Sequence, residues 1–451
     1  MPMKEIRKLI IVLLAAVFFI GLFILCDRYA EDVRDEYASQ INPSIVGQKK
    51  SSSQEGRVSS PEELSVEKLV QDMVTEDYSA SITLSAAGDI LCQRSQLERA
   101  YQTENQSFDF SDSFDHVRDL FQSSDYAIAT LKTTFAGIYR GASDEFYGYS
   151  TANAQYNSPE ILADNIKGTG ISLVNIATNH SLDSGDSGLA STINYLDTAG
   201  LEHVGAAAAQ EDDTDFSINI NGIQVGFIGY TNTTNGFSLA SDASCVLNTL
   251  NEYSEDNIEV LCRQVTAMKN ENDLVVVMLN FGSVESDSPE TEQRALAEKL
   301  CGAGADLILG TGSRVLKPVE QISVTDEISG RTKKCLVLYG MGALLSGETY
   351  SSSGKDTDIS AVFDFNIIRN EFGETFITSF AVIPVYLNWY DGKIQPVPVC
   401  EAKDTSKYAD ELDEDDMERI NSAYENTITS VLEGSGLTAE YRDYAFQVQL
   451  P

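Results

Sequence analysis

Short apolar runs alternate with amphipathic segments along most of the chain from Ser81 onward. The runs are rich in β-branched residues and span residues 82–88, 126–131, 171–177, 225–230, 273–279, 306–310 and 335–340. Continuous apolar runs of this length are typical of strands that are covered on both faces. The pattern therefore predicts an α/β fold with largely parallel strands.

Helices are expected between these strands. Amphipathic segments span residues 159–167, 188–199, 258–270 and 290–301. Pro159 and Pro289 suit the first turn of a helix, and Gly168, Gly200 and Gly302 suit helix ends.

The C-terminal part of the sequence has a different pattern. The runs at 361–368 and 376–387 have no helix between them, so they predict an antiparallel addition to the sheet. Residues 403–433 predict an acidic helix that acts as a solvated cap. We therefore predict a main domain at 81–390 and an acidic C-terminal extension at 391–451.

Residues 9–26 form an unbroken run of eighteen apolar or small residues. At 1.5 Å per residue a helix of this length spans about 27 Å, enough to cross the hydrocarbon core of a bilayer. Basic residues precede the run and acidic residues follow it, so residues 1–8 are expected to be a cytoplasmic stub. The sequence predicts a single-pass protein of the cell membrane with its C-terminal domain outside the cell.

Three alternatives to a membrane anchor remain at this point. A cleaved signal peptide has a shorter apolar region and a small-x-small cleavage site, and no such site lies near Cys26. Lipid modification of Cys26 is disfavoured by the bulky Leu25 before it. A buried helix of the soluble domain would not be apolar all round. Residues 27–80, which include a Ser-rich charged stretch at 48–64, predict a solvated linker.

Composition excludes several classes of function. The chain has 31 Lys and Arg against 69 Asp and Glu, a formal net charge of −38. Nucleic acid is excluded as a partner, because binding phosphates requires clustered basic residues. Hydrophobic residues make up 42% of the chain, which excludes global disorder. With only His116, His180 and His203, the sequence also excludes a site built from four or five imidazoles.

Cysteine spacing does not identify a site. The cysteines outside the apolar run are Cys92, Cys245, Cys262, Cys301, Cys335 and Cys400, and no C-x-x-C pair occurs among them. A zinc knuckle is therefore not expected. Six cysteines allow roughly 15 disulfide pairings, and the sequence does not choose among them. Cys301 and Cys335 fit the pattern of small buried hydrophobic residues.

Polar and glycine residues follow the predicted strands where a site is expected. In open α/β sheets, ligands bind outside the carboxyl ends of the strands. The candidates at these positions are Asp89, Lys132, Asn179, His180, Asn280, Gly310, Gly312 and Arg314. This selection rests on the strand pattern alone.

Three motifs in order also resemble a known family. They are Gly88-Asp89 after a strand, A-T-N-H-S-L-D-S-G at 177–185, and G-A-D-L-I-L-G at 304–310. Between about Ile82 and Leu345 the chain resembles the CapA family of capsule or poly-γ-glutamate synthesis proteins. The resemblance implies a four-layer α/β/β/α sandwich similar to calcineurin-like metallophosphoesterases. It also implies a location outside the cell and work with an anionic envelope polymer.

The chain departs from this family at several motifs. The family's Asn-Leu-Glu is Thr-Leu-Lys at 130–132 here, its His-Trp-Gly is Asn-Phe-Gly at 280–282, and its Gly-His-His-Pro-His is Gly-Thr-Gly-Ser-Arg at 310–314. The resemblance implies that Asp89 is a carboxylate ligand of a metal and that Asn179 is a carbonyl-oxygen ligand. His180 would be the group that protonates a leaving oxygen.

These departures disfavour two-metal catalysis. A binuclear site holds its ions about 3.5–4 Å apart and needs several anionic or imidazole ligands. Lys132 instead brings a positive charge, and the Asn280 amide is a poor ligand for a transition metal. We therefore expect no cofactor, or at most one weakly bound Mg, Mn or Ca ion. Lys132 and Arg314, with Asn280 and the backbone of Gly310 and Gly312, are expected to bind a phosphate or carboxylate.

Two classes of function follow. The first is a membrane-anchored binding or scaffold subunit in capsule or poly-γ-glutamate synthesis or export, a pseudoenzyme whose partners are the envelope polymer or polymer-synthase subunits. The second is a phosphoesterase, or a hydrolase or transferase of a γ-glutamyl polymer, that uses one divalent ion with Asp89, Asn179 and His180.

Overall fold

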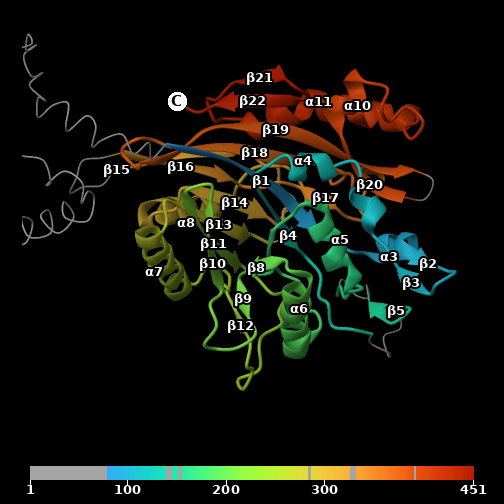
Figure 1. Cartoon of the computed structure of the whole chain (residues 1–451), viewed down its shortest axis with the longest axis horizontal. Helices are drawn as coiled ribbons and strands as arrows, with labels where there is room; N and C mark the ends of the chain where they lie inside the picture. Colours follow the sequence, from blue (N-terminus) through green and yellow to red (C-terminus); the bar gives the residue numbers. More distant parts are fainter. Residues whose placement is uncertain (1–78, 139–144, 151–154, 283–285, 326–331, 391–392) are drawn as a thin grey trace, which may run out of the picture. The chain divides into compact units, whose positions relative to one another are not determined.

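Two β-sheets, with helices on their outer faces, position the candidate site (Figure 1). The structure is a computed structural model and describes residues 79–138, 145–150, 155–282, 286–325, 332–390 and 393–451. These residues belong to one compact unit, Glu76–Pro451.

The first sheet combines parallel and antiparallel strands. Its path is β21-β22-β19-β18-β1-β4-β7-β8, with β17 paired to β1 and β20 paired to β19. The strands are β1 (Ala80–Ile90), β4 (Tyr126–Leu131), β7 (Leu173–Asn175), β8 (Glu202–Val204), β17 (Ala343–Leu345), β18 (Ile359–Arg369), β19 (Thr375–Tyr390), β20 (Lys393–Pro398), β21 (Ala439–Arg442) and β22 (Ala445–Gln449). Strands β1, β4, β7 and β8 are parallel. Strands β18 and β19 are antiparallel, which confirms the prediction for 361–368 and 376–387.

The second sheet has the order β10-β11-β13-β14-β16-β15. Its strands are β10 (Asp215–Ile220), β11 (Ile223–Thr231), β13 (Leu274–Asn280), β14 (Leu307–Thr311), β15 (Val319–Thr325) and β16 (Thr332–Leu338). The four central strands are parallel, and β10 and β15 are antiparallel edges. The mixed α/β class predicted from the apolar runs is confirmed, with the runs divided between two sheets.

Helices and short strand pairs complete the unit. The helices are α3 (Arg94–Ala100), α4 (Arg118–Gln122), α5 (Ile161–Thr169), α6 (Gly185–Ala199), α7 (Glu255–Glu271), α8 (Thr291–Ala303), α9 (Tyr350–Ser353), α10 (Val399–Asp404), α11 (Glu414–Leu432) and the 3₁₀ helix η1 (Ser111–Phe114). The short strands are β2 (Tyr101–Gln102), β3 (Ser107–Phe108), β5 (Glu145–Phe146), β6 (Tyr149–Ser150), β9 (Ala206–Ala207) and β12 (Val246–Leu247). The predicted helices at 159–167, 188–199, 258–270 and 290–301 correspond to α5, α6, α7 and α8.

Alternating side chains on each strand divide the core into three apolar layers. Leu84 and Phe363 of the first sheet pack with Val276 of the second between the two sheets. On the outer face of the second sheet, Val275 and Val277 pack with α7 and α8. Helices α5 and α6 cover the outer face of the first sheet. The layer order is therefore helices, sheet, sheet, helices, and each central strand is buried on both faces.

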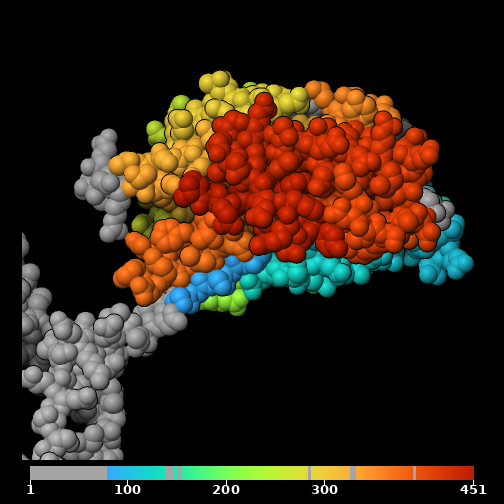
Figure 2. Space-filling model, turned by 90° about the horizontal axis from the view of Figure 1, so that it is seen from above, coloured from blue at the N-terminus to red at the C-terminus, as the bar shows by residue number. Residues whose placement is uncertain are grey.

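The C-terminal residues are part of this unit. The sequence places a boundary between 390 and 391, but β20 pairs with β19 over Val385–Tyr390, and β22 pairs with β19 over Ser379–Val382. Helix α11 packs through Ile420 against Tyr386 of β19. Figure 2 shows the C-terminal residues, in red, as a continuous layer across this face. Because these strands add to the main sheet, the acidic segment is an integral part of the fold.

Two sequence predictions concern membranes and cysteines. The apolar run at 9–26 lies outside the described residues, as does nearly all of the 27–80 linker. Within the described part of the chain, no helix is long and apolar enough to span a bilayer. In the same part every cysteine is unpaired, and Cys301 and Cys335 are buried, as expected for small hydrophobic residues.

Candidate functional site

The carboxyl ends of strands from both sheets meet at one edge of the unit. Asp89 lies near the end of β1, and Lys132 directly follows the neighbouring β4. From the second sheet, Gly312 directly follows β14, and its backbone N–H donates to Asp89 Oδ2 at 3.1 Å. This hydrogen bond joins the two sheets where the strand pattern places a ligand crevice.

A local irregularity in β1 positions Asp89. The register of β1 shifts between Ala86 and Asp89 against β4, and again after Asp89 against β17. Gly88 approaches the backbone of Gly342 so closely that a Cβ atom there would lie 2.0 Å from the Gly342 carbonyl oxygen. The backbone N–H of Asp89 donates to the same carbonyl at 3.2 Å. Glycine at 88 is therefore required for the strand to deliver Asp89 to this point.

Asp89 and Lys132 form a buried ion pair. Lys132 Nζ lies 3.3 Å from Asp89 Oδ2, and the two side chains are 1% and 0% exposed. The backbone N–H of Lys132 donates to the Ile90 carbonyl, which continues the pairing of β4 with β1. The lysine therefore neutralises the carboxylate from within the fold.

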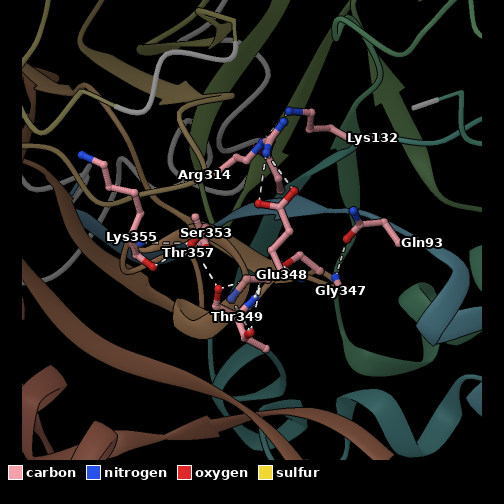
Figure 3. Close-up of polar contacts among 12 residues, drawn as sticks. Gln93, Lys132, Arg314, Gly347, Glu348, Thr349, Ser353, Lys355 and Thr357 are labelled. Carbon is pink, nitrogen blue, oxygen red and sulfur yellow. Dashed lines mark hydrogen bonds and ion pairs between the residues drawn. The ribbon is translucent and has the colours of Figure 1, made fainter. Parts of the chain in front are cut away.

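Arg314 lies in the turn that follows β14. Gly310 lies inside β14, paired with Leu279, while Gly312 has a positive φ of +91°. Arg314 Nη1 contacts both carboxylate oxygens of Glu348, at 2.8 and 3.0 Å. Figure 3 shows the Lys132 and Arg314 side chains pointing toward one another, with Glu348 reaching Arg314 from the segment before α9.

A second cluster surrounds His180, in the turn after β7. Asp183 Oδ2 lies 2.8 Å from His180 Nδ1 and also accepts the backbone N–H of Tyr156 at 2.7 Å. Because an ionised carboxylate only accepts hydrogen bonds, Nδ1 carries a proton and donates it to Asp183. The rings of His180 and Tyr156 lie 4.6 Å apart. Burial raises the pKa of Tyr156, so its hydroxyl stays protonated at neutral pH.

Several buried polar atoms among the predicted residues have no protein partner. They are Asp89 Oδ1, Asn179 Oδ1 and Asn280 Nδ2, together with Thr130 Oγ1 and Thr311 Oγ1 of the strand ends. Asn179 also donates through Nδ2 to Asn235 Oδ1 at 3.2 Å. Because buried polar groups are nearly always hydrogen-bonded, such atoms indicate where a ligand or water binds.

Sequence reasoning missed several residues of this region. Glu348, Tyr156 and Gln93 carry no motif, and only the tertiary contacts reveal them. Asp183 lies in the motif at 177–185, and its position three residues after His180 is the signal for this short-range pair. Lys317 is 1% exposed, its Nζ has no partner, and burial lowers its pKa.

The donors at this edge do not suit a binuclear metal centre. Asp89 Oδ2 is already occupied by the Lys132 ammonium and the Gly312 N–H. Among the described residues, no three His, Cys, Asp or Glu side chains converge as metal ligands. Two divalent ions need several such ligands, and a fixed ammonium beside the carboxylate repels them. The atoms left over, Asp89 Oδ1 and Asn179 Oδ1, are oxygen donors of the kind that a single hard cation accepts.

Known proteins are similar to this chain in sequence. The model of the family described as bacterial capsule synthesis protein PGA_cap matches residues 83–348. The PGA biosynthesis protein CapA of Bacillus subtilis (strain 168) is 25% identical over 323 residues, which cover 70% of this chain and 74% of that protein. The capsule biosynthesis protein CapA of Bacillus anthracis is 25% identical over 341 residues, which cover 74% of this chain and 73% of that protein.

Among solved structures, a calcineurin-like phosphoesterase, YfkN of Bacillus subtilis, is similar with a TM-score of 0.39 and 13% identity. The match covers 78% of this chain and 98% of that one.

Proposed function

The chain belongs to the family of bacterial capsule synthesis proteins PGA_cap, and we propose that it is a membrane-anchored binding or scaffold subunit in the synthesis or export of an anionic capsule polymer, poly-γ-glutamate. In this proposal residues 9–26 anchor the chain and the C-terminal domain lies outside the cell. Its partners are the polymer and the subunits of the polymer synthase.

The observation that carries a binding role is the buried Lys132–Asp89 pair. The resemblance to the family makes Asp89 a metal ligand, but here its carboxylate is neutralised by a lysine from the adjacent strand. Breaking this pair to admit a metal would leave a buried ammonium without its counterion, at a cost of about 3–5 kcal/mol. The site therefore disfavours activation of a metal-bound water, and an anion would be recognised by the more exposed Arg314 at its mouth.

A second candidate function is supported by His180. Its Nδ1 is oriented by Asp183, so Nε2 is free to exchange a proton with a bound substrate. Asp89 Oδ1 and Asn179 Oδ1 are unpartnered oxygens of the kind that a hard cation accepts, and in this candidate they hold one hydrated Mg, Mn or Ca ion. This candidate is a phosphoesterase, or a γ-glutamyl hydrolase or transferase, that works with one divalent ion.

Metal content and turnover distinguish the two candidates. The full-length chain is purified and its bound Mn, Zn, Mg and Ca are measured by mass spectrometry, together with hydrolysis of a chromogenic phosphodiester. A binding subunit holds no stoichiometric Mn or Zn and shows no turnover that depends on His180. Stoichiometric metal, with activity lost in His180→Ala but kept in the control His203→Ala, would contradict the binding role.

Anchoring is tested separately. Membranes of cells that make the full chain are separated from the soluble fraction, and intact cells are treated with an external protease. An anchored extracellular domain stays with the membrane and is cleaved from outside. Recovery of the whole chain in the soluble fraction would contradict the anchor.

A further inference from the structure

At the mouth of the site, Arg314 contacts Glu348 in the way that an arginine binds the carboxylate of a ligand. Arg314 Nη1 lies 2.8 and 3.0 Å from the two oxygens of the Glu348 carboxylate. We infer that Glu348 is an internal substitute for a ligand carboxylate, and that a glutamyl polymer binds Arg314 by displacing it. This inference rests on the proposed function, because it names the ligand group and the residue that such a subunit uses.

Exposure distinguishes this ion pair from its buried neighbour. The side chains of Arg314 and Glu348 are 30% and 20% exposed, whereas those of Lys132 and Asp89 are sealed from solvent. Part-exposed ion pairs contribute little to stability, because water replaces the partner that leaves. A ligand can therefore replace Glu348 cheaply, while the Lys132–Asp89 pair stays closed beneath.

The backbone at Arg314 supports a functional role. Its φ is +63°, a left-handed conformation that residues with a side chain rarely adopt. The hydroxyl of Ser313 donates to the Val315 carbonyl at 2.7 Å, and this bond spans the turn. Strained residues that are held in this way cluster at ligand-binding sites. Because of this conformation, the turn after β14 places the guanidinium of Arg314 at the edge of the site.

The segment that carries Glu348 is fastened beside the site. The backbone N–H of Gly347 donates to Gln93 Oε1 (Figure 3). Gln93 Nε2 contacts the Tyr156 hydroxyl at 3.4 Å. Tyr156 in turn packs on the ring of His180. The segment that carries Glu348 is therefore connected to the His180 cluster through Gln93 and Tyr156.

Charge selects the class of ligand. The chain carries a formal charge of −38, so an anionic polymer is repelled except where positive charge is concentrated. At the site, Lys132 is paired with Asp89, and Arg314 contacts Glu348. A ligand carboxylate that takes the place of Glu348 brings one negative charge to Arg314, whereas a phosphate dianion brings two negative charges to the same place beside Asp89. The site therefore favours a carboxylate.

Unpartnered atoms beside Arg314 suit the rest of such a polymer. A Cβ atom on Gly312 would lie 3.0 Å from Asn280 Nδ2, which places this unpartnered donor against the Arg314 turn. Asn280 Nδ2 is a donor without an acceptor, and the amide carbonyl of a γ-glutamyl chain would supply one. Arg314 would then recognise the carboxylate of a unit and Asn280 its amide.

Direct binding tests the inference. The full-length chain is titrated into a fluorescently labelled γ-glutamyl decamer, and its affinity is measured by anisotropy. Glu348→Gln keeps the shape of the side chain but weakens its hold on Arg314, so affinity should rise about fivefold. Arg314→Gln should lower affinity about tenfold or more. Glu440→Gln, which removes an exposed carboxylate on β21, is the matched control for net charge and should change affinity less than twofold.

Each outcome is decisive. Unchanged or weaker binding by Glu348→Gln overturns the role of Glu348. Binding of the decamer by the wild type and by Arg314→Gln with equal affinity overturns the inference but leaves the proposed function standing, since the polymer then binds elsewhere. Absence of binding in the wild type and in every variant overturns both. Stronger competition by inorganic phosphate than by glutarate would overturn the choice of a carboxylate ligand.

Discussion

Lys132 Nζ lies 3.3 Å from Asp89 Oδ2 in a site where both side chains are almost wholly buried. The two residues are 43 positions apart in the sequence and are brought together because β1 and β4 are adjacent and parallel. The ammonium group of Lys132 therefore pairs with Asp89, the carboxylate that would be a metal ligand according to the family resemblance.

The first prediction concerns the stability of this pair. Lys132→Met leaves the Asp89 carboxylate buried without a counterion, and we expect the free energy of unfolding to fall by about 3–5 kcal/mol. The double variant Lys132→Met with Asp89→Asn should recover most of this loss, because the buried carboxylate is gone. Chemical denaturation of the full chain measures both values.

The exposed pair Arg94–Glu98 provides the control. Arg94→Ala should lower the free energy of unfolding by less than about 1 kcal/mol, as is usual for surface pairs. A loss in Lys132→Met no larger than in Arg94→Ala would contradict the role of the buried pair.

The second prediction concerns Gly88. A Cβ atom at this position would lie 2.0 Å from the Gly342 carbonyl oxygen, a backbone atom that cannot move without disturbing the pairing of β1 with β17. Gly88→Ala should therefore lower the free energy of unfolding by roughly 3 kcal/mol or more. Thermal and denaturant unfolding measure the loss.

Gly302 is the matched glycine. It lies in α8, and a Cβ atom there would meet nothing within 4 Å. Gly302→Ala should stabilise the protein by up to about 1 kcal/mol, because alanine favours the helix. Equal effects of the two substitutions would show that the close approach at Gly88 is not required.

The third prediction is a dependence of stability on pH. Asp364 of β18 accepts a hydrogen bond from the Ser85 hydroxyl, and burial raises the pKa of this carboxyl to about 6. The folded state therefore binds its proton more tightly than the unfolded state, whose aspartates have a pKa of about 3.9. This contribution to stability is present at low pH, falls as the pH rises from about 4 to 6, and stays lost above that range.

Asp364→Asn removes this titration. Relative to the wild type, its free energy of unfolding should increase by up to about 3 kcal/mol between pH 3 and pH 7, since one pKa unit corresponds to 1.36 kcal/mol. Ser85→Ala should enlarge the pH dependence, because the Ser85 hydrogen bond lowers the pKa of Asp364. Parallel pH profiles for the wild type and Asp364→Asn would contradict the assignment.

The fourth prediction concerns divalent cations. Because the chain has a net charge of −38, we expect millimolar Mg²⁺ or Ca²⁺ to raise its affinity for a γ-glutamyl oligomer by bridging carboxylates. Anisotropy titrations at constant ionic strength separate bridging from general screening. An affinity that stays flat across the titration would contradict this expectation.

Local patterns in the sequence predicted much of the fold. Apolar runs identified β1, β4, β7, β11, β13, β14 and β16, and amphipathic segments identified α5 to α8. These features are readable because burial on both faces of a strand and on one face of a helix imposes a period on neighbouring residues. Motif order also identified the family, and strand ends supplied Asp89, Lys132, Asn280 and Gly312 as candidates that the structure brings to one edge.

Tertiary structure alone decided how these candidates are paired. No local pattern shows that Lys132 is sealed against Asp89, that Glu348 reaches Arg314, or that the strands of the acidic C-terminal segment join β19. Such contacts join residues far apart in the chain, and they depend on strand register and on the close approach of backbones such as that of Gly88 to Gly342. Residue types and periods are local properties, whereas the partner of a buried charge is set by packing of the whole domain.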